Sequence, residues 1–285
     1  MFTPGRTAVL YHSDDAKERI MAIPKIIHYV WVGDGEKPEL VERCIASWRR
    51  YAPDYQLVEW NNEKFHQTDN QYARQAFAAN KWAFVSDYLR LYALATQGGF
   101  YLDTDLELTG DLEPFRQHQF VTGYERFKNR YAPLTALMGA EAGHSMISDM
   151  LAMYQQRSFI RSDGSFDLTP NTGLIAQHFA QKFGLQPPYQ GANPTQLEPG
   201  AVIYPSHYFC TPEAGLPNYA IHHFNGSWFP EYERKPLFSM TGYSLALLKR
   251  NKVRSGQLPL LHGEHLVACW RLFKRYSLLL ASQHS

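Results

Sequence analysis

The chain has 285 residues, of which 45% are hydrophobic and 19% are charged, so it is long and apolar enough to fold around a sizeable core. Its 28 basic residues against 27 acidic residues leave a formal net charge of +1. This balance argues against a general nucleic-acid binder, because affinity for the phosphate backbone needs a basic surplus. The cysteines Cys44, Cys210 and Cys269 are far apart, which favours neither a disulfide framework nor a CxxC metal site.

The N-terminus lacks the pattern of a targeting segment. Residues 1–20 mix charged and polar side chains without the apolar stretch of a signal peptide, and no apolar run reaches membrane-spanning length. Together with the cysteine pattern, this predicts a cytoplasmic protein that is soluble or attached peripherally to the inner face of the membrane.

The first part of the chain predicts alternating strands and helices. Runs of β-branched and aromatic residues indicate strands, and apolar residues at helical spacing indicate helices. The expected elements are, in order, a strand over 23–33, a helix over 38–52, a strand over 55–60, a helix over 82–97 and a strand over 99–108. Gly98 and Gly99 suit a left-handed cap at the end of the second helix. This order predicts a largely parallel sheet whose ligand crevice lies beyond the carboxyl ends of its strands.

The second part predicts more of the same sheet and a helical tail. The expected strands are 120–125, 134–139, 201–205 and 219–224, and the expected helices are 144–156, 173–183, 244–252 and 264–281. Residues 187–199 are expected to form a proline-rich loop. We therefore expect an N-terminal extension over 1–22, a single catalytic domain over 23–240 and a helical C-terminal extension over 241–285.

Two acidic residues, Asp103 and Asp105, lie at the polar end of the expected strand GGFYLDTDLEL. The two-residue period of a strand places both side chains on one face. Two neighbouring carboxylates are costly unless a cation neutralises them, and hard oxygen ligands suit Mn²⁺ or Mg²⁺. The structural alternative is a solvated turn at the strand end, since such triplets arise often by chance.

Asp87 and Arg90 lie together on the helix that precedes this strand. An i,i+3 surface ion pair is the simpler interpretation, and it contributes only a few tenths of a kcal/mol, roughly. The alternative is that both residues belong to a site with the metal. A cation beside an arginine is what a departing diphosphate needs, because its developing negative charge must be stabilised in place.

Three segments then resemble glycosyltransferase family 32, sugar-transferring enzymes with a DXD motif that include capsular-polysaccharide and yeast outer-chain mannosyltransferases. The segments are IPKIIHYVWVG (23–33), AFVSDYLRLYALATQGGFYLDTDLEL (83–108) and AIHHFNGSW (220–228). Large glucosylating toxins share the pattern. The resemblance implies a GT-A-like, mostly parallel central sheet flanked by helices. It also implies metal-dependent transfer, with retention at the anomeric carbon, from a UDP- or GDP-sugar to a glycan or lipid-linked acceptor in the synthesis of surface polysaccharide such as capsule or lipopolysaccharide.

The resemblance also implies roles for single residues. Trp31 is expected to stack on the donor base, with Val32 and Thr104 beside it in the donor site, although a strand tryptophan is equally common in a core. Asp87 and Arg90 are expected to hold the ribose or the donor sugar, while Asp103 and Asp105 contact ribose and metal. Arg90, Asp103 and Asp105 would together support the departure of the leaving group.

The segment AIHHFNGSW implies further ligands. His222 or His223 is expected to be a third metal ligand; a strand directs neighbouring side chains to opposite faces, so only one faces the metal, and the spacing to Ser227 slightly favours His222. Ser227 and Trp228 are expected on a loop that closes over the diphosphate and excludes water.

Weaker expectations concern four other residues. Glu107 is a conceivable participant in the reaction, because no carboxylate nucleophile is otherwise assigned. Asn171, Thr172 and Gly173 open an expected helix whose amide end suits an anion or a hydroxyl, although the same residues are common in ordinary N-caps.

Other interpretations of the motifs remain open. A haloacid-dehalogenase-type phosphatase also has a strand that ends in DxD, but its pattern calls for Thr or Val at the position of Glu107. Gly33 and Gly35 follow a strand as in dinucleotide-binding folds, yet Pro38 replaces the third glycine. A non-catalytic carbohydrate-binding protein would explain the 14% aromatic content.

The C-terminal segment mixes aromatic and basic residues in a way that allows two interpretations. As a helix, residues 264–281 would either pack on the catalytic domain or lie on an anionic membrane surface. Packing is the simpler interpretation, and a lipid-linked acceptor would favour the membrane.

Overall fold

The structure is a computed structural model that describes residues 23–127, 130–189, 192–225, 232–240, 243–250, 264–273 and 276–283. The expected extension over 1–22 lies outside these residues. The described part of the chain contains no helix that is both long and apolar enough to cross a membrane.

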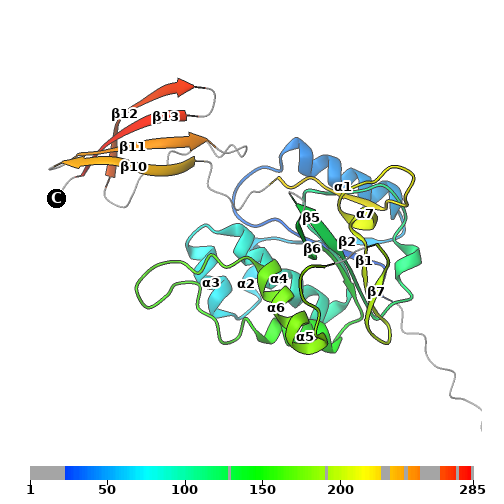
Figure 1. Cartoon of the computed structure of the whole chain (residues 1–285). Helices are drawn as coiled ribbons and strands as arrows, with labels where there is room; N and C mark the ends of the chain where they lie inside the picture. The colour runs from blue at the N-terminus through cyan, green and yellow to red at the C-terminus, as the bar shows by residue number, and fades with distance from the viewer. Residues whose placement is uncertain are drawn as a thin grey trace, which may run out of the picture.

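A seven-stranded sheet forms the centre of the protein, in the order β2-β1-β3-β6-β5-β8-β7 (Figure 1). Its strands are β1 (Ile26–Val30), β2 (Gln56–Trp60), β3 (Gly99–Leu102), β5 (Phe120–Phe127), β6 (Arg130–Ala140), β7 (Thr195–Glu198) and β8 (Ala201–Tyr204). β1 pairs parallel with β2 and β3, and β8 pairs parallel with β5. Only β6 and β7 run against the other strands, because each pairs antiparallel with its neighbours. The predicted α/β fold with a mainly parallel sheet is confirmed.

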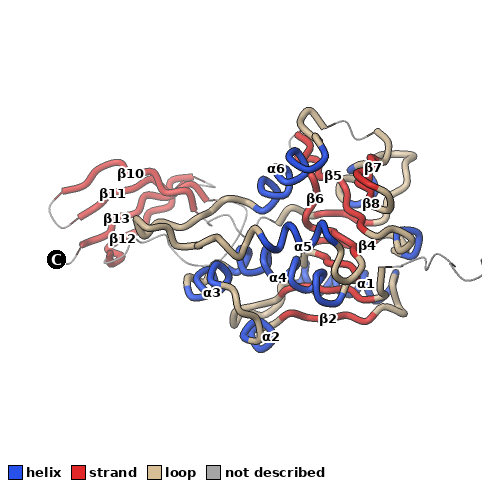
Figure 2. Tube along the Cα trace, turned by 90° about the horizontal axis from the view of Figure 1, so that it is seen from below, coloured by secondary structure: helices blue, strands red, loops and turns tan. Residues whose placement is uncertain are grey.

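Helices cover both faces of this sheet (Figure 2). They are α1 (Glu39–Tyr51), α2 (Asn62–His66), α3 (Gln71–Ala78), α4 (Trp82–Gln97), α5 (Ser145–Ala152), α6 (Asn171–Phe183) and α7 (Ser206–Phe209), with a 3₁₀ turn over Glu113–Phe115. The buried side chains of α3 to α6 form one apolar core, which includes Leu89 and Phe179. Those of α1 and α7 form a second core on the other face, which includes Trp48 and Phe209. The sequence did not predict α2, α3, α7 or β7.

The turn after α4 depends on its glycine. Gly98 has φ +64, a conformation that side chains rarely adopt, and it caps the helix by donating its N–H to the carbonyl of Leu94 at 3.0 Å. A Cβ atom at Gly98 would lie only 2.6 Å from the backbone nitrogen of Ala142. The chain can therefore reverse directly from α4 into β3; the glycine that was expected ends the helix, but its ψ of −163 differs from that of the expected left-handed cap.

The predicted helical C-terminal extension is wrong. The chain there forms a separate four-stranded antiparallel sheet, whose strands are β10 (Tyr232–Met240), β11 (Tyr243–Arg250), β12 (Glu264–Phe273) and β13 (Tyr276–Gln283). Ala246 and Leu248 are buried on β11, and Leu279 and Ala281 are buried on β13, which is the two-residue period of a strand. Ala246 lies directly opposite Leu279. Burial of these cross-strand pairs outweighs the helix propensity of Leu and Ala. β10 also begins before residue 241, where the extension was expected.

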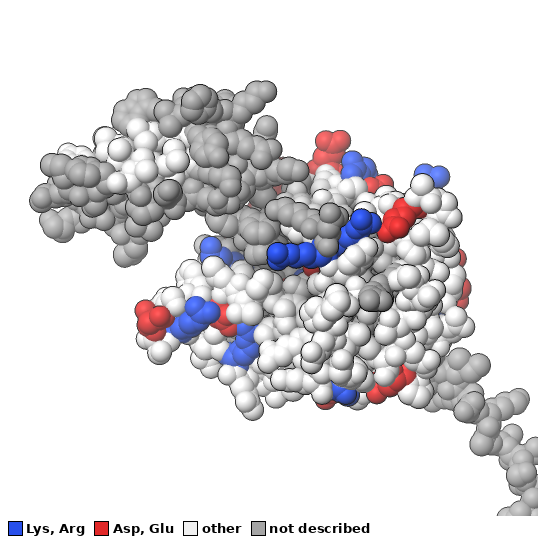
Figure 3. Space-filling view, viewed as in Figure 1, with Lys and Arg blue, Asp and Glu red and all other residues white. Residues whose placement is uncertain are grey.

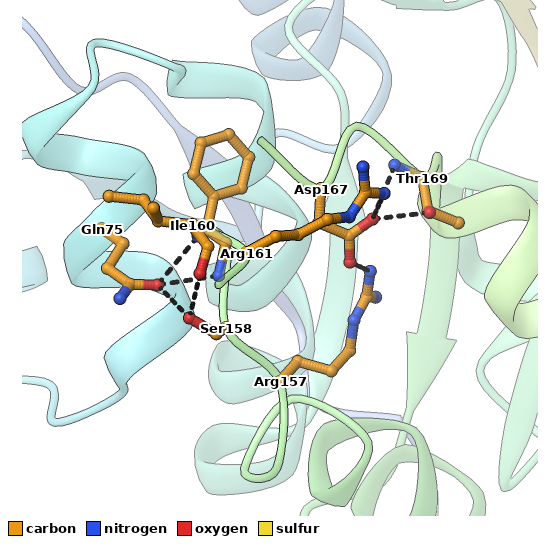
Figure 4. Close-up of polar contacts among 8 residues, drawn as sticks. Gln75, Arg157, Ser158, Ile160, Arg161, Asp167 and Thr169 are labelled. Carbon is orange, nitrogen blue, oxygen red and sulfur yellow. Dashed lines mark hydrogen bonds and ion pairs between the residues drawn. The ribbon is translucent and has the colours of Figure 1, made fainter. Parts of the chain in front are cut away.

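Polar contacts attach the loop between α5 and α6 to the body of the protein (Figure 4). The side-chain oxygen of Gln75 on α3 accepts hydrogen bonds from Ser158 Oγ at 2.8 Å and from the backbone nitrogen of Ile160 at 3.1 Å. Further along the loop, Asp167 pairs with Arg157. The two ends of the loop are thereby held together just before α6 begins.

His28 on β1 is fully buried, and both of its ring nitrogens have partners. Nε2 lies 2.8 Å from the carbonyl oxygen of Gly98, and Nδ1 accepts a hydrogen bond from Trp60 Nε1 at 3.2 Å. These partners define a neutral imidazole that donates from Nε2, because a proton on Nδ1 would remove the acceptor for Trp60. Burial lowers the pKa of His28 to about 4.

We expect this histidine to make the protein less stable in mild acid. The unfolded chain takes up a proton at His28 near its ordinary pKa of 6.5, whereas the folded chain does so only near 4, so stability falls as the pH decreases between these values. From about pH 7 to about pH 5 the loss amounts to about 2 kcal/mol.

Urea unfolding of the wild type and of His28→Gln at both pH values tests this prediction. The other histidines titrate in the same way in both proteins, so the difference between them isolates His28. An equal loss of stability in the two proteins would contradict the assignment of a buried neutral imidazole.

Candidate active site

Asp103, Thr104 and Asp105 form a turn that follows the carboxyl end of β3, an inner strand of the sheet. The strand expected over 99–108 is interrupted here: β3 ends at Leu102, and β4 covers Leu106–Leu108. The backbone nitrogen of Leu106 donates to the carbonyl of Asp103 at 2.9 Å, which closes the turn. The two carboxylates therefore meet because the chain turns between them, and the strand alternation expected from the sequence is wrong at this point.

His222 is brought to this turn by strand pairing. β9 (Ala220–His222) pairs antiparallel with β4, and His222 lies opposite Leu106 in the register. His222 Nε2 is 3.4 Å from Asp105 Oδ1. The other oxygen of Asp105 accepts a hydrogen bond from the backbone nitrogen of Asn225 at 2.8 Å. Two segments more than a hundred residues apart thus form one site.

Asp103, Asp105 and His222 fit a divalent cation. One ligand atom from each residue lies within 4.8 Å of the others, which makes a three-ligand group on one side of a common centre. Two carboxylate oxygens and an imidazole nitrogen are an acceptable ligand set for Mn²⁺, and Mg²⁺ tolerates the same oxygens. Three protein ligands leave coordination positions for substrate oxygens.

The two carboxylates, Asp103 and Asp105, concentrate negative charge beside His222. Burial disfavours the charged imidazolium of His222, but the carboxylates of Asp105 and Asp103 outweigh this effect and raise its pKa to about 10. Burial likewise opposes ionisation of Asp105, but His222 and the backbone of Asn225 hold its pKa below the ordinary value. A divalent cation would neutralise this concentration of negative charge.

Arg90 connects α4 to the metal-ligating turn. Its side chain is buried, and Nη2 lies 3.1 Å from Asp87 Oδ1 and 3.2 Å from Asp103 Oδ1. Nη1 donates to the carbonyl of Thr135 on β6 at 2.8 Å. Burial raises the pKa of Asp87 to about 7, against the opposing effect of Arg90. The pair expected as either a surface contact or a site component is therefore buried, and its arginine contacts Asp103.

Tyr101 and Asn171 complete the surroundings of Arg90. The Tyr101 hydroxyl donates to Asp103 Oδ1 at 2.7 Å, and the Arg90 guanidinium lies 4.6 Å from the centre of the Tyr101 ring. Asn171 Oδ1 accepts from Thr135 Oγ1 at 3.2 Å. Its amide nitrogen is buried without a hydrogen-bond partner among the residues the structure describes. Asn171 is the first residue of α6 and Pro170 is its N-cap, so Asn171 does not have the ordinary capping role.

The remaining predicted residues lie in different places. His223 Nε2 lies 2.8 Å from Glu107 Oε2, so these two residues pair with each other outside the metal-ligand group. Trp31 is partly buried, its Nε1 donates to the carbonyl of Gly35 at 2.8 Å, and Val32 is buried in the core. Of the other predicted residues, Thr104 and Thr172 are partly buried and Gly173 is exposed. Ser227 and Trp228 lie outside the described residues.

Sequence reasoning missed several residues of this site. Tyr101, Thr135 and Asn225 contact the predicted ligands or Arg90 through hydrogen bonds that depend on neighbouring strands and turns. Glu125 on β5 was also missed. Burial raises its pKa to about 7, and the charges of His222 and Asp103 act on it.

Residues 38–122 match the protein family described as "Glycosyltransferase sugar-binding region containing DXD motif". A curated relative, inositol phosphoceramide mannosyltransferase 3 of Schizosaccharomyces pombe, is 28% identical over 145 residues, which cover 48% of this chain. The aligned part spans only 39% of the length of that relative. Both the matched family and this relative are described as glycosyltransferases, which favours the glycosyltransferase interpretation over a phosphatase or a non-catalytic carbohydrate-binding protein.

Solved structures with a partly similar chain path include "PaToxG Glycosyltransferase", with a TM-score of 0.42, 20% identity and coverage of 57% of this chain and 71% of that chain. The UDP-bound glycosyltransferase domain of the YGT toxin has a TM-score of 0.32 and 12% identity, over 58% of this chain and 69% of that chain. These scores are too low to add weight. The family match confirms the resemblance of residues 38–122 to the sugar-binding region of DXD-motif glycosyltransferases.

Proposed function

We propose that the protein is a metal-dependent, retaining glycosyltransferase that moves a sugar from a UDP- or GDP-sugar to a glycan or glycolipid. The observation that carries this proposal is the group of Asp103, Asp105 and His222, with ligand atoms within 4.8 Å of one another, of which the two aspartates lie inside the family match over 38–122. Asp103 and Asp105 would hold Mn²⁺ or Mg²⁺, with His222 as the third ligand. The cation would neutralise the diphosphate as it leaves.

The residues around the cation have separate tasks in this proposal. Arg90 fixes the position of Asp103 and adds positive charge beside the leaving diphosphate. Asp87 accepts hydrogen bonds from hydroxyl groups of the ribose or the donor sugar. Trp31 faces the base, with Val32 and Thr104 nearby. Ser227 and Trp228 are proposed to cover the diphosphate, which would exclude water that hydrolyses the donor.

The acceptor and the cellular setting are proposals as well. The curated relative is a mannosyltransferase that by its name acts on inositol phosphoceramide, which supports a lipid-linked acceptor. A role in surface polysaccharide synthesis, in the cytoplasm at the inner face of the membrane, is compatible with such an acceptor. The described C-terminal segment forms strands and no helix, so a membrane contact through an amphipathic helix is not proposed. Lys, Arg, Asp and Glu side chains are intermixed on the face in Figure 3.

A screen of nucleotide sugars tests the proposed function. Purified protein is incubated with UDP- and GDP-sugars, oligosaccharide or glycolipid acceptors and Mn²⁺, and released nucleoside diphosphate is measured. We expect release with a matching donor, its loss after addition of chelator and its return with excess Mn²⁺ or Mg²⁺. Turnover that persists in chelator would rule out metal dependence. Binding of sugars without any donor consumption would instead identify a carbohydrate-binding protein.

A further inference from the structure

One face of strand β5 leads toward the metal-ligand group, which consists of Asp103, Asp105 and His222. Val121 is buried in the core that lies on the α1 side of the sheet, and a Cβ atom at Gly123 would lie 3.0 Å from Phe209 in the same core. Two positions further along, the ring of Phe127 lies 5.2 Å from that of Phe224. Because alternate residues of a strand share a face, Glu125 points to this side too.

The far end of this face reaches His222. The ring of Phe224 lies 4.2 Å from that of His222, so Phe127, Phe224 and His222 form a continuous series of rings. Glu125 lies two residues before Phe127 on the same strand face, and its carboxylate experiences the charges of His222 and Asp103. Glu125 is therefore located beside the metal-ligand group, on the side formed by β5.

Glu125 differs from the other acidic groups of the site in its contacts. Asp87, Asp103, Asp105 and Glu107 each pair with an arginine or a histidine. Among the residues that the structure describes, no group forms a hydrogen bond or an ion pair with Glu125. It is also absent from the three-residue group whose atoms lie close enough to share one cation. Glu125 is partly buried, and burial raises its pKa, so a hydrogen-bond donor from a ligand would stabilise its charged form.

We propose that Glu125 contacts the sugar substrate and that its carboxylate accepts a hydrogen bond from a sugar hydroxyl beside the metal-ligand group. This inference rests on the proposed function. In that function the diphosphate would bind the cation, so the sugar attached to it and the acceptor would lie next to Asp103 and His222. Glu125 lies on β5, whereas Arg90, which contacts Asp103, lies on α4.

The hydroxyl belongs either to the transferred sugar or to the acceptor, and reactions of Glu125 variants with and without acceptor distinguish these sources. Glu125→Gln keeps the shape of the side chain but removes its charge. Glu125→Asp keeps the charge on a side chain that is one carbon shorter. Glu63→Gln on the exposed side of α2 is the matched control. We expect Glu125→Gln to lower kcat/KM for transfer by about 10-fold to 100-fold, the effect of losing one charged hydrogen bond.

The readouts separate a substrate contact from a structural role. The midpoint of thermal unfolding is expected to stay near that of the wild type. The Kd for nucleoside diphosphate with Mn²⁺ is expected to stay within about twofold of the wild-type value, because in this proposal Glu125 contacts the sugar and not the diphosphate. If the contact is with the donor sugar, hydrolysis of the donor without acceptor falls together with transfer. If it is with the acceptor, hydrolysis is retained while the KM for the acceptor rises.

Two results would overturn the inference. Transfer and hydrolysis by Glu125→Gln at wild-type rates, with unchanged KM values, would show that Glu125 makes no productive contact. An equal loss of nucleoside diphosphate binding would assign it to the metal site instead. Failure of the proposed function is a different outcome: the wild type itself would then consume no donor, whereas failure of this inference alone leaves the wild type active.

Discussion

Asp105→Asn is expected to lower kcat/KM for sugar transfer by at least about 100-fold, the scale of losing one preorganised charge contact in an active site. The amide keeps the size of the side chain, but it removes the negative charge that faces His222 at 3.4 Å. It also weakens a ligand of the proposed cation. The measurement is transfer with Mn²⁺, together with Mn²⁺ affinity in the presence of nucleoside diphosphate.

The control for this prediction is Asp111→Asn. Asp111 is an exposed residue near the same turn, and its side chain accepts a hydrogen bond from the backbone nitrogen of Glu113 at 2.9 Å, which an asparagine oxygen can also accept. We expect this variant to retain activity and metal affinity. If Asp105→Asn kept full activity and bound Mn²⁺ like the wild type, the proposed metal site would be wrong.

Arg90→Met is expected to destabilise the fold by about 3–5 kcal/mol and to abolish transfer, because it leaves two carboxylates without their buried partner. The guanidinium joins Asp87, Asp103 and the carbonyl of Thr135 in one arrangement. Arg90→Lys retains the charge but cannot reach all three acceptors from one ammonium group, so it is expected to fold and yet lose at least about 10-fold in activity.

Urea unfolding and transfer rates of both variants measure these effects. Arg74→Met is the matched control, since Arg74 pairs with the exposed Asp69 at the surface and such pairs contribute only about 0–1 kcal/mol. A stability loss for Arg90→Met no larger than that of Arg74→Met would show that the buried arrangement around Arg90 contributes little.

Local patterns in the sequence were sufficient to predict the elements that bury one continuous face. The helix expected over 82–97 was found as α4, with identical bounds, because its apolar residues recur at helical spacing and a glycine ends it. The C-terminal segment was predicted incorrectly for the converse reason. Leu and Ala residues favour helices in isolation, and only cross-strand burial, as between Ala246 and Leu279, reveals a sheet.

For the site, the sequence by itself determined which residue types are present: the DXD carboxylates, Asp87 with Arg90, and the histidine pair. Only the tertiary structure decided which of them meet. Pairing of β4 with β9 directs the side chain of His222 to the Asp105 carboxylate and that of His223 to Glu107, and the alternation of β5 places Glu125 beside both Asp103 and His222. Contacts between segments far apart in the chain depend on strand register and packing, which short sequence patterns do not encode.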